Sequence, residues 1–179
     1  MDQIATAAAH IAVALPEIAD EKLARHSAAR LLITASTPGV GEGVARRIHD
    51  AGPRARLPFV RMLAVDLPGA ADRLRHRCGL ALAAAAGGTL LLSDVEQLEP
   101  LVQASLLNVL EDLESARART PAVRLISDTT VSLPDRIARG EFCERLFYRL
   151  NILHLTVGDR PVRARRGPGE QTDGFFDGS

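Results

Sequence analysis

The segment "LLITASTPGVGEGVARRIH", residues 31–49, decides how the chain folds. An apolar run is followed by a turn that contains glycine and proline, and then by a stretch with the spacing of a helix. A strand, a glycine-rich turn and a helix N-terminus form the arrangement with which proteins bind the phosphates of a nucleotide. The lysine that such a loop normally contributes is absent here. The loop is therefore a phosphate site, the remnant of one, or only a turn.

Strands and helices alternate along the rest of the chain. Apolar residues at helical spacing predict helices, and short apolar runs predict buried strands. The run "GGTLLLSDV", residues 87–95, indicates a strand that is covered on both faces. The alternation predicts an α/β fold with a five-stranded, mostly parallel sheet. The expected strands are 30–35, 57–68, 87–95, 122–130 and 151–157, and the expected helices are 2–15, 43–52, 71–87, 99–118 and one or two within 133–150.

Some side chains can be assigned to the core from the same patterns. The two cysteines, Cys78 and Cys143, lack the spacing of a metal site, and we expect both to be buried thiols in a reducing compartment. The clearest helix, 99–118, has an expected buried stripe of Leu101, Leu106, Val109, Leu110 and Leu113.

The bulk composition is that of an ordinary soluble domain, with 46% hydrophobic and 25% charged residues. The formal net charge is zero, so no global field attracts DNA or an anionic membrane. Aromatic residues make up 3%, which leaves few platforms for base stacking. We expect a cytoplasmic protein without direct DNA binding and without a membrane segment.

Six motifs occur in one order between residues 30 and 157. After the glycine loop with its "ARRIH" come "PFV", "GGTLLLSDVEQL", "QASLLNVLED", "VRLISDTT" and "GEFCERLFYRLNIL". This series resembles the AAA+ ATPase domain of bacterial sigma-54-dependent transcription activators, the enhancer-binding proteins. Those have "GESGTGKE", "PFV", "GGTLFLDEI", "Q…LLRVLQE", "VRIIAATN" and "FREDLYYRLNV". In that family the domain forms a ring, hydrolyses ATP and remodels sigma-54 RNA polymerase through a "GAFTGA" loop.

The resemblance implies an AAA+ type P-loop NTPase-like αβα sandwich. It divides the chain into an N-terminal helix packing on the core (1–29), a degenerate AAA+ sigma-54-interaction-like domain (30–157) and a disordered tail (158–179). The 18 residues between Pro68 and Gly87 contain no "GAFTGA". No helical lid is expected after the fifth strand.

The resemblance also locates the phosphate loop, and it indicates that the loop is a remnant. Counted back from "IH" at 48–49, the lysine falls on Gly41, and a shift by one places it on Glu42, which repels phosphate. The only lysine of the chain, Lys22, precedes the strand. A lost contact of this kind costs about 1.5–3 kcal/mol. The vestigial loop comprises Ala35, Ser36, Thr37, Pro38, Gly39, Val40, Gly41 and Glu42.

The magnesium and sensor positions are altered as well. The family's "DE" after the third strand corresponds to Ser93 and Asp94, so one carboxylate is lost and the other is one methylene shorter. Each loss is expected to lower the rate on the order of 10²-fold. The sensor asparagine corresponds to Thr130. We therefore expect no functional metal site, and only vestigial catalytic candidates in Asp94, Thr130 and Arg149.

Arg149 corresponds to the second of two family arginines that act on a neighbour's nucleotide, while the first corresponds to Cys143. Arg149 could act across a ring. Alternatively, it could pair with Glu141 and Arg145 along one helix face, because the three are spaced four residues apart.

These features together predict a pseudo-ATPase that regulates transcription or an AAA+ assembly through protein–protein contacts. The expected partner is an active AAA+ sigma-54 activator or a second copy of this chain, and no cofactor is expected. The alternative is a residual ATP-binding sensor or slow ATPase of the same family, which would bind ATP and Mg²⁺.

Overall fold

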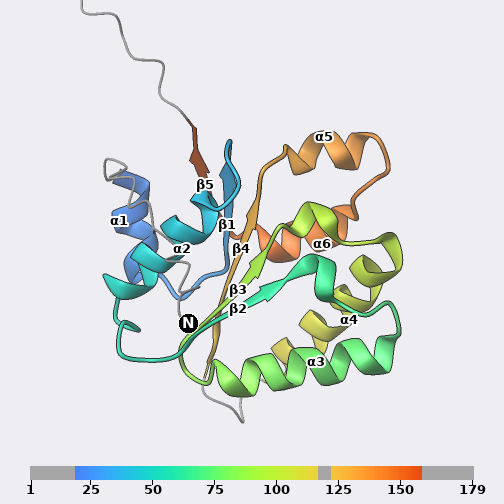
Figure 1. The fold of residues 1–179 in the computed structure, drawn as a ribbon, viewed down its shortest axis with the longest axis horizontal. Helices are drawn as coiled ribbons and strands as arrows, with labels where there is room; N and C mark the ends of the chain where they lie inside the picture. Colours follow the sequence, from blue (N-terminus) through green and yellow to red (C-terminus); the bar gives the residue numbers. More distant parts are fainter. Residues whose placement is uncertain (1–18, 117–121, 159–179) are drawn as a thin grey trace, which may run out of the picture.

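The computed structural model describes residues 19–116 and 122–158 (Figure 1). The expected helix 2–15 and nearly all of the expected tail lie outside the described residues. The strands are β1 (Leu31–Ala35), β2 (Phe59–Leu63), β3 (Thr89–Ser93), β4 (Arg124–Thr129) and β5 (Leu153–Val157). The helices are α1 (Ala19–His26), α2 (Val40–Asp50), α3 (Ala71–Ala84), α4 (Pro100–Ala116), α5 (Leu133–Ala138) and α6 (Glu144–Leu150), with short 3-10 turns η1 (Ala64–Asp66) and η2 (Val95–Gln97).

The five strands form one sheet in the order β2-β3-β4-β1-β5, and all four pairings are parallel. Helices cover both faces, with α1 and α2 on one side and α3, α4 and α6 on the other (Figure 1). Successive residues of a strand point to opposite faces, so β1 directs Leu31 and Ile33 toward α2, and Leu32 toward the α3–α4 side. The αβα sandwich expected from the sequence is confirmed.

Several element boundaries differ from the sequence expectation, most of them by one to three residues, and two of these differences have a clear cause. The second strand was expected over 57–68, but β2 ends at Leu63 because the chain turns into η1. The helix expected to begin at Gly43 begins at Val40, since Gly39 adopts φ 80 and lets the chain enter the helix earlier.

Two expected core positions are wrong. Leu101 is 65% exposed, and Val102, its neighbour in the first turn of α4, is buried in its place. Cys143 is only half-buried, whereas Cys78 is buried as expected, and both thiols are free. Leu106, Val109 and Leu110 are buried as expected, and the side chain of Leu113 lies outside the described part.

A buried carboxylate joins α1 to α2. Glu21 is 1% exposed, and both of its oxygens accept hydrogen bonds from Arg47 of α2, at 3.2 and 3.1 Å. Arg25, one turn along α1, adds a third contact at 3.5 Å. A carboxylate removed from water is stable only when it is paired in this way, so the clamp fixes α1 against the sandwich.

We expect Glu21→Gln to lower the free energy of unfolding by about 2 kcal/mol, because the neutral side chain loses its charge-assisted hydrogen bonds with Arg47. Urea unfolding followed by circular dichroism measures the change. Asp112→Asn is the matched control, since Asp112 pairs with Arg75 at the surface and both side chains are more than half exposed. The control should cost under about 1 kcal/mol. Equal losses in the two variants would contradict the assignment of a buried clamp.

Candidate functional site

The vestigial loop lies where the sequence places it, between the carboxyl end of β1 and the first turn of α2. The loop amide of Ser36 donates to the carbonyl of Val157 at 3.1 Å, which ties the loop to β5. Ser36, Thr37 and Pro38 are exposed. The helix begins without a side-chain cap, and Gly39 occupies the capping position. The loop therefore joins β1 to α2 with its first residues open to solvent.

The interior of this loop is filled by an aspartate from β4. Gly41 is buried, and a Cβ atom placed there would be 2.6 Å from the Cβ atom of Asp128. Real Cβ atoms essentially never approach so closely. The family motif "VRIIAATN" has alanine where this chain has Asp128. The position that corresponds to the lysine therefore has no room for a side chain.

Asp128 also closes the gap toward the end of β3. Its Oδ1 accepts a 2.7 Å hydrogen bond from the backbone amide of Asp94, which has the left-handed φ of 58. Burial raises the pKa of Asp128 to about 6; the amide of Asp94 and the charge of Arg61 oppose this shift, while the charges of Asp94 and Glu96 add to it. At neutral pH the site therefore contains a buried, costly negative charge.

An internal arginine bridges the positions that would hold phosphate and Mg²⁺. Arg61 of β2 forms a 3.1 Å ion pair with Glu42, and its Nε donates to the hydroxyl of Ser93 at 3.2 Å. Arg46, which lies 4.4 Å from the ring centroid of Phe59, makes a second contact with Glu42 at 3.8 Å. The loop is thus connected to the end of β3 by a cation that belongs to the chain itself.

The sensor position is occupied by an internal contact as well. Oε1 of Glu96 accepts hydrogen bonds from the amide and the hydroxyl of Thr130, at 3.1 and 2.7 Å. Glu96 is 8% exposed, and its Oε2 is buried without a hydrogen-bond partner. Its carbonyl accepts from Arg136 of α5 at 3.0 Å. Glu96 therefore contacts Thr130 through its side chain and α5 through its backbone.

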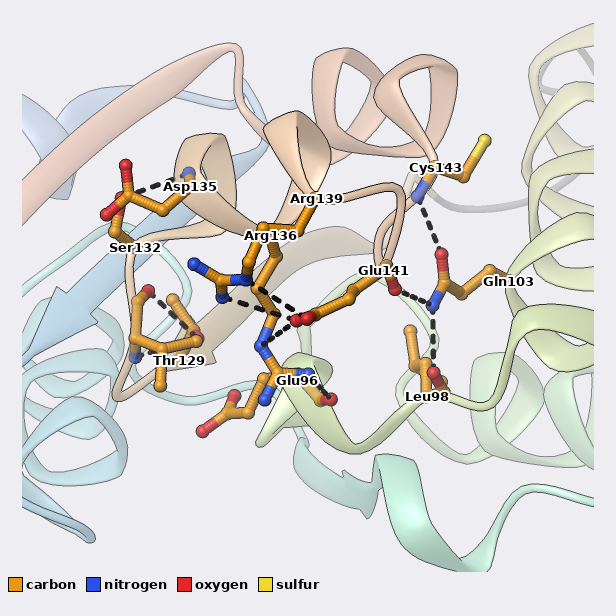
Figure 2. Close-up of polar contacts among 11 residues, drawn as sticks. Glu96, Leu98, Gln103, Thr129, Ser132, Asp135, Arg136, Arg139, Glu141 and Cys143 are labelled. Carbon is orange, nitrogen blue, oxygen red and sulfur yellow. Dashed lines mark hydrogen bonds and ion pairs between the residues drawn. The ribbon is translucent and has the colours of Figure 1, made fainter.

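The segment before α6 is held by a buried glutamine (Figure 2). Nε2 of Gln103 donates to the carbonyls of Leu98 and Glu141, at 2.9 and 3.2 Å, and its Oε1 accepts from the amide of Cys143 at 2.7 Å. The Glu141 side chain faces Arg139, which donates two hydrogen bonds to its carboxylate, at 3.0 and 3.2 Å.

The expected pairing of Glu141 with Arg145 and Arg149 is therefore wrong. Glu141 precedes α6 rather than belonging to it, so the assumed helical spacing does not apply. Arg145 and Arg149 instead contact Glu111 of α4, at 3.1 and 3.4 Å. Arg149 thus joins α6 to α4, and whether it also acts across a ring stays a prediction.

The structure brings Gly41, Asp94 and Asp128 together, and sequence reasoning missed the last of these. It also missed Arg61 and Glu96. For Arg61 the available signal was a charged residue inside the otherwise apolar strand "FVRML". Across 19–116 and 122–158, no group of three or more His, Cys, Asp or Glu side chains could hold a metal ion. Over the same ranges, no helix is long and apolar enough to cross a membrane.

We expect Asp128→Asn to raise the free energy of unfolding at pH 7.5 by about 3 kcal/mol, because the pKa of Asp128 rises from 3.8 to about 6 and each unit corresponds to about 1.4 kcal/mol. The folded pKa, about 6, lies above the ordinary value of 3.8, so the folded state binds the proton more tightly. Protonation of Asp128 therefore stabilises the folded state. This contribution is fully present below about pH 4 and is lost as the pH rises through about 6.

Urea unfolding of both proteins between pH 4.5 and 8 measures this dependence. The difference in the free energy of unfolding between Asp128→Asn and the wild type should grow up to about pH 6 and then level off. A difference that is independent of pH would contradict the raised pKa.

Residues 68–156 match the protein family described as the Sigma-54 interaction domain. The match begins after the vestigial loop. Among curated proteins, the transcriptional regulatory protein GlrR of Escherichia coli is 35% identical over 164 residues, which cover 81% of this chain and 36% of GlrR. The Nif-specific regulatory protein of Azospirillum lipoferum is 33% identical over 143 residues, 70% of this chain and 23% of that protein. The chain thus spans about a quarter to a third of these relatives.

Solved structures agree with this placement. NtrX from Brucella abortus, crystallised in complex with ATP, is 31% identical with a TM-score of 0.62, over 78% of this chain and 35% of NtrX. The P-loop NTPase domain of a sigma-54 activator from E. coli is 25% identical with a TM-score of 0.55, over 76% of this chain and 88% of that domain. The order of motifs, the parallel sheet and these similarities lead to one conclusion: the chain belongs to the sigma-54 interaction domain family of AAA+ P-loop NTPases.

Proposed function

We propose that this chain is a member of the sigma-54 activator family that does not hydrolyse ATP and that regulates transcription or an AAA+ assembly through protein–protein contacts. The observation that carries the proposal is the ion pair between Arg61 and Glu42, together with the hydrogen bond from Arg61 to Ser93. These contacts join, without a ligand, the two sides of the site that a Mg²⁺–nucleotide complex connects in an active P-loop enzyme.

The charges around the loop also support the proposal that ATP is not hydrolysed. In an active P-loop site, a lysine and Mg²⁺ neutralise the phosphates. Here, Glu42 and Asp128 bring negative charge to the loop, and Arg61 is already paired with Glu42. A triphosphate would have to break that pair and approach a buried carboxylate, so the electrostatic balance opposes its binding.

The same loop also has little room for a phosphate and few hydrogen-bond donors to bind one. Asp128 fills the volume beside Gly41, and Pro38 has no backbone amide to offer to a phosphate. The amides of the first turn of α2 still offer partial positive charge, which is the basis of the alternative, a residual nucleotide sensor.

The surface near α6 supports contact with a protein. Tyr148 on α6 and Ile152, which follows it, are 61% and 58% exposed. They belong to the "FYRLNIL" segment, which in the resembling activators lies near the boundary between subunits. Large exposed apolar side chains beside arginines are typical of interaction surfaces. We propose that this segment contacts an active sigma-54 activator or a second copy of the chain.

Calorimetric titration with MgATP tests the loss of nucleotide binding. We expect a Kd weaker than about 1 mM and no phosphate release, because the chain supplies neither the lysine nor the first carboxylate. Micromolar binding without turnover would favour the sensor. Micromolar binding with turnover that Asp94→Ala abolishes would contradict the proposal.

Co-elution with an active sigma-54 activator of the same cell tests the protein contact. We expect a complex that changes the activator's ATPase rate, and the double variant Tyr148→Ser/Ile152→Ser should weaken it at least about tenfold. Leu80→Ser is the matched control, because Leu80 is 58% exposed on α3. Failure to bind either an activator or a second copy, or equal losses in the two variants, would contradict the proposed surface.

A further inference from the structure

An apolar pocket lies between the sheet and the helices α3 and α4, on the face opposite α1 and α2. Its volume is about 320 Å³. The two helices contact one another beside β2 and β3 (Figure 1), and the pocket lies within the hydrophobic cluster that they share with these strands. None of the described residues that line it belongs to the vestigial loop. A ligand in this pocket would therefore not compete for the nucleotide site.

The pocket exists because α3 presents small side chains on one side of it. Cys78 is buried, and Gly79 and Ala83, which lie one turn apart on α3, line the same space. A Cβ atom placed on Gly79 would meet no atom within 4 Å. The helix therefore leaves room that a chain of larger side chains at these positions would fill.

The other walls of the pocket are formed by larger aliphatic side chains. The sheet contributes one residue of β2, two of β3 and one of β4, which are Met62, Leu90, Leu92 and Leu125. The wall from α4 consists of residues at helical spacing, Leu106, Val109 and Leu110. Well-ordered leucines surround most of the space, and Met62 adds a side chain that adapts easily to the shape of a ligand.

One charged side chain reaches the pocket. Among the described residues that line it, only Arg30 carries a charge. Arg30 is buried, and its Nη1 donates to the carbonyl of Arg149 at 3.0 Å, which anchors the guanidinium to the end of α6. Burial raises the pKa of the Cys78 thiol to about 11, against the opposing charge of Arg77, so the thiol is neutral at pH 7. The described lining thus offers few of the two to four hydrogen bonds that an ordered water needs.

We propose that this pocket binds a small, uncharged, apolar molecule of the size of two fused rings. An apolar cavity of about 150 Å³ holds a benzene ring, so a volume of about 320 Å³ accommodates a molecule twice as large. The hydrophobic effect favours the transfer of such a molecule from water to these walls. An anionic ligand is disfavoured, because its carboxylate would lose its hydration among aliphatic side chains.

Titration of the full chain with indole tests the pocket. Indole is uncharged and consists of two fused rings, and the chain contains no tryptophan, so the emission of the ligand is free of protein indole fluorescence. We expect a saturable shift of this emission to shorter wavelength, with a Kd below about 1 mM, because the ring leaves water for an apolar site. Thermal unfolding provides a second readout, and Tm should rise with indole concentration.

Two variants locate the binding in this pocket. Cys78→Leu places a larger side chain in the interior and should weaken indole binding at least about tenfold. Ala83→Leu occupies the rim and should have the same effect, which provides the measurement if Cys78→Leu does not fold. Ala84→Leu is the matched control, because Ala84 is the next residue of α3, is exposed and does not line the pocket. This control should bind indole as the wild type does.

The charge of the ligand is tested with indole-3-acetate, which carries a carboxylate on the same ring system. We expect it to bind at least about tenfold more weakly than indole, because of the cost of desolvating its charge. The absence of a saturable shift with indole, equal affinities in Ala83→Leu and Ala84→Leu, or tighter binding of indole-3-acetate than of indole would overturn the proposal.

Discussion

The contacts of Arg61 with Glu42 and Ser93 connect the loop after β1 to the end of β3. In a P-loop enzyme the loop and the end of the third strand each contribute to binding a charged ligand, and the ligand holds them together. In this chain a guanidinium from the neighbouring strand does so instead. The rest of the sandwich keeps the architecture of the family.

The internal replacement extends beyond this one pair. Asp128 fills the volume beside Gly41 and accepts a hydrogen bond from the amide of Asp94, while Glu96 binds the amide and hydroxyl of Thr130. Each of these contacts uses a group that lies at a family site position. The free-energy cost of burying these groups is reflected in the raised pKa of Asp128 and in the unpartnered oxygen of Glu96. The buried polar groups of the site are thus satisfied only in part.

The architecture was predictable from the sequence because the core strands are short apolar runs and the helices have a clear apolar spacing. Sequence reasoning also located the loop and both altered strand ends. Sequence reasoning failed where contacts between distant segments determine which side chains are buried or paired. Leu101 has the right spacing for the stripe, but it lies in the first turn of α4 and faces outward. Glu141 has helical spacing to Arg145, yet the helix begins only at Glu144. The roles of Arg61 and Asp128 could not be deduced, because they depend on which strands are neighbours.

The close approach of Gly41 and Asp128 couples the two positions. Lysine at 41 would place its Cβ against that of Asp128, while alanine at 128 alone would leave the amide of Asp94 without its acceptor. The first change is disfavoured by packing and the second by a lost hydrogen bond, so substitutions at the two positions are not independent of one another.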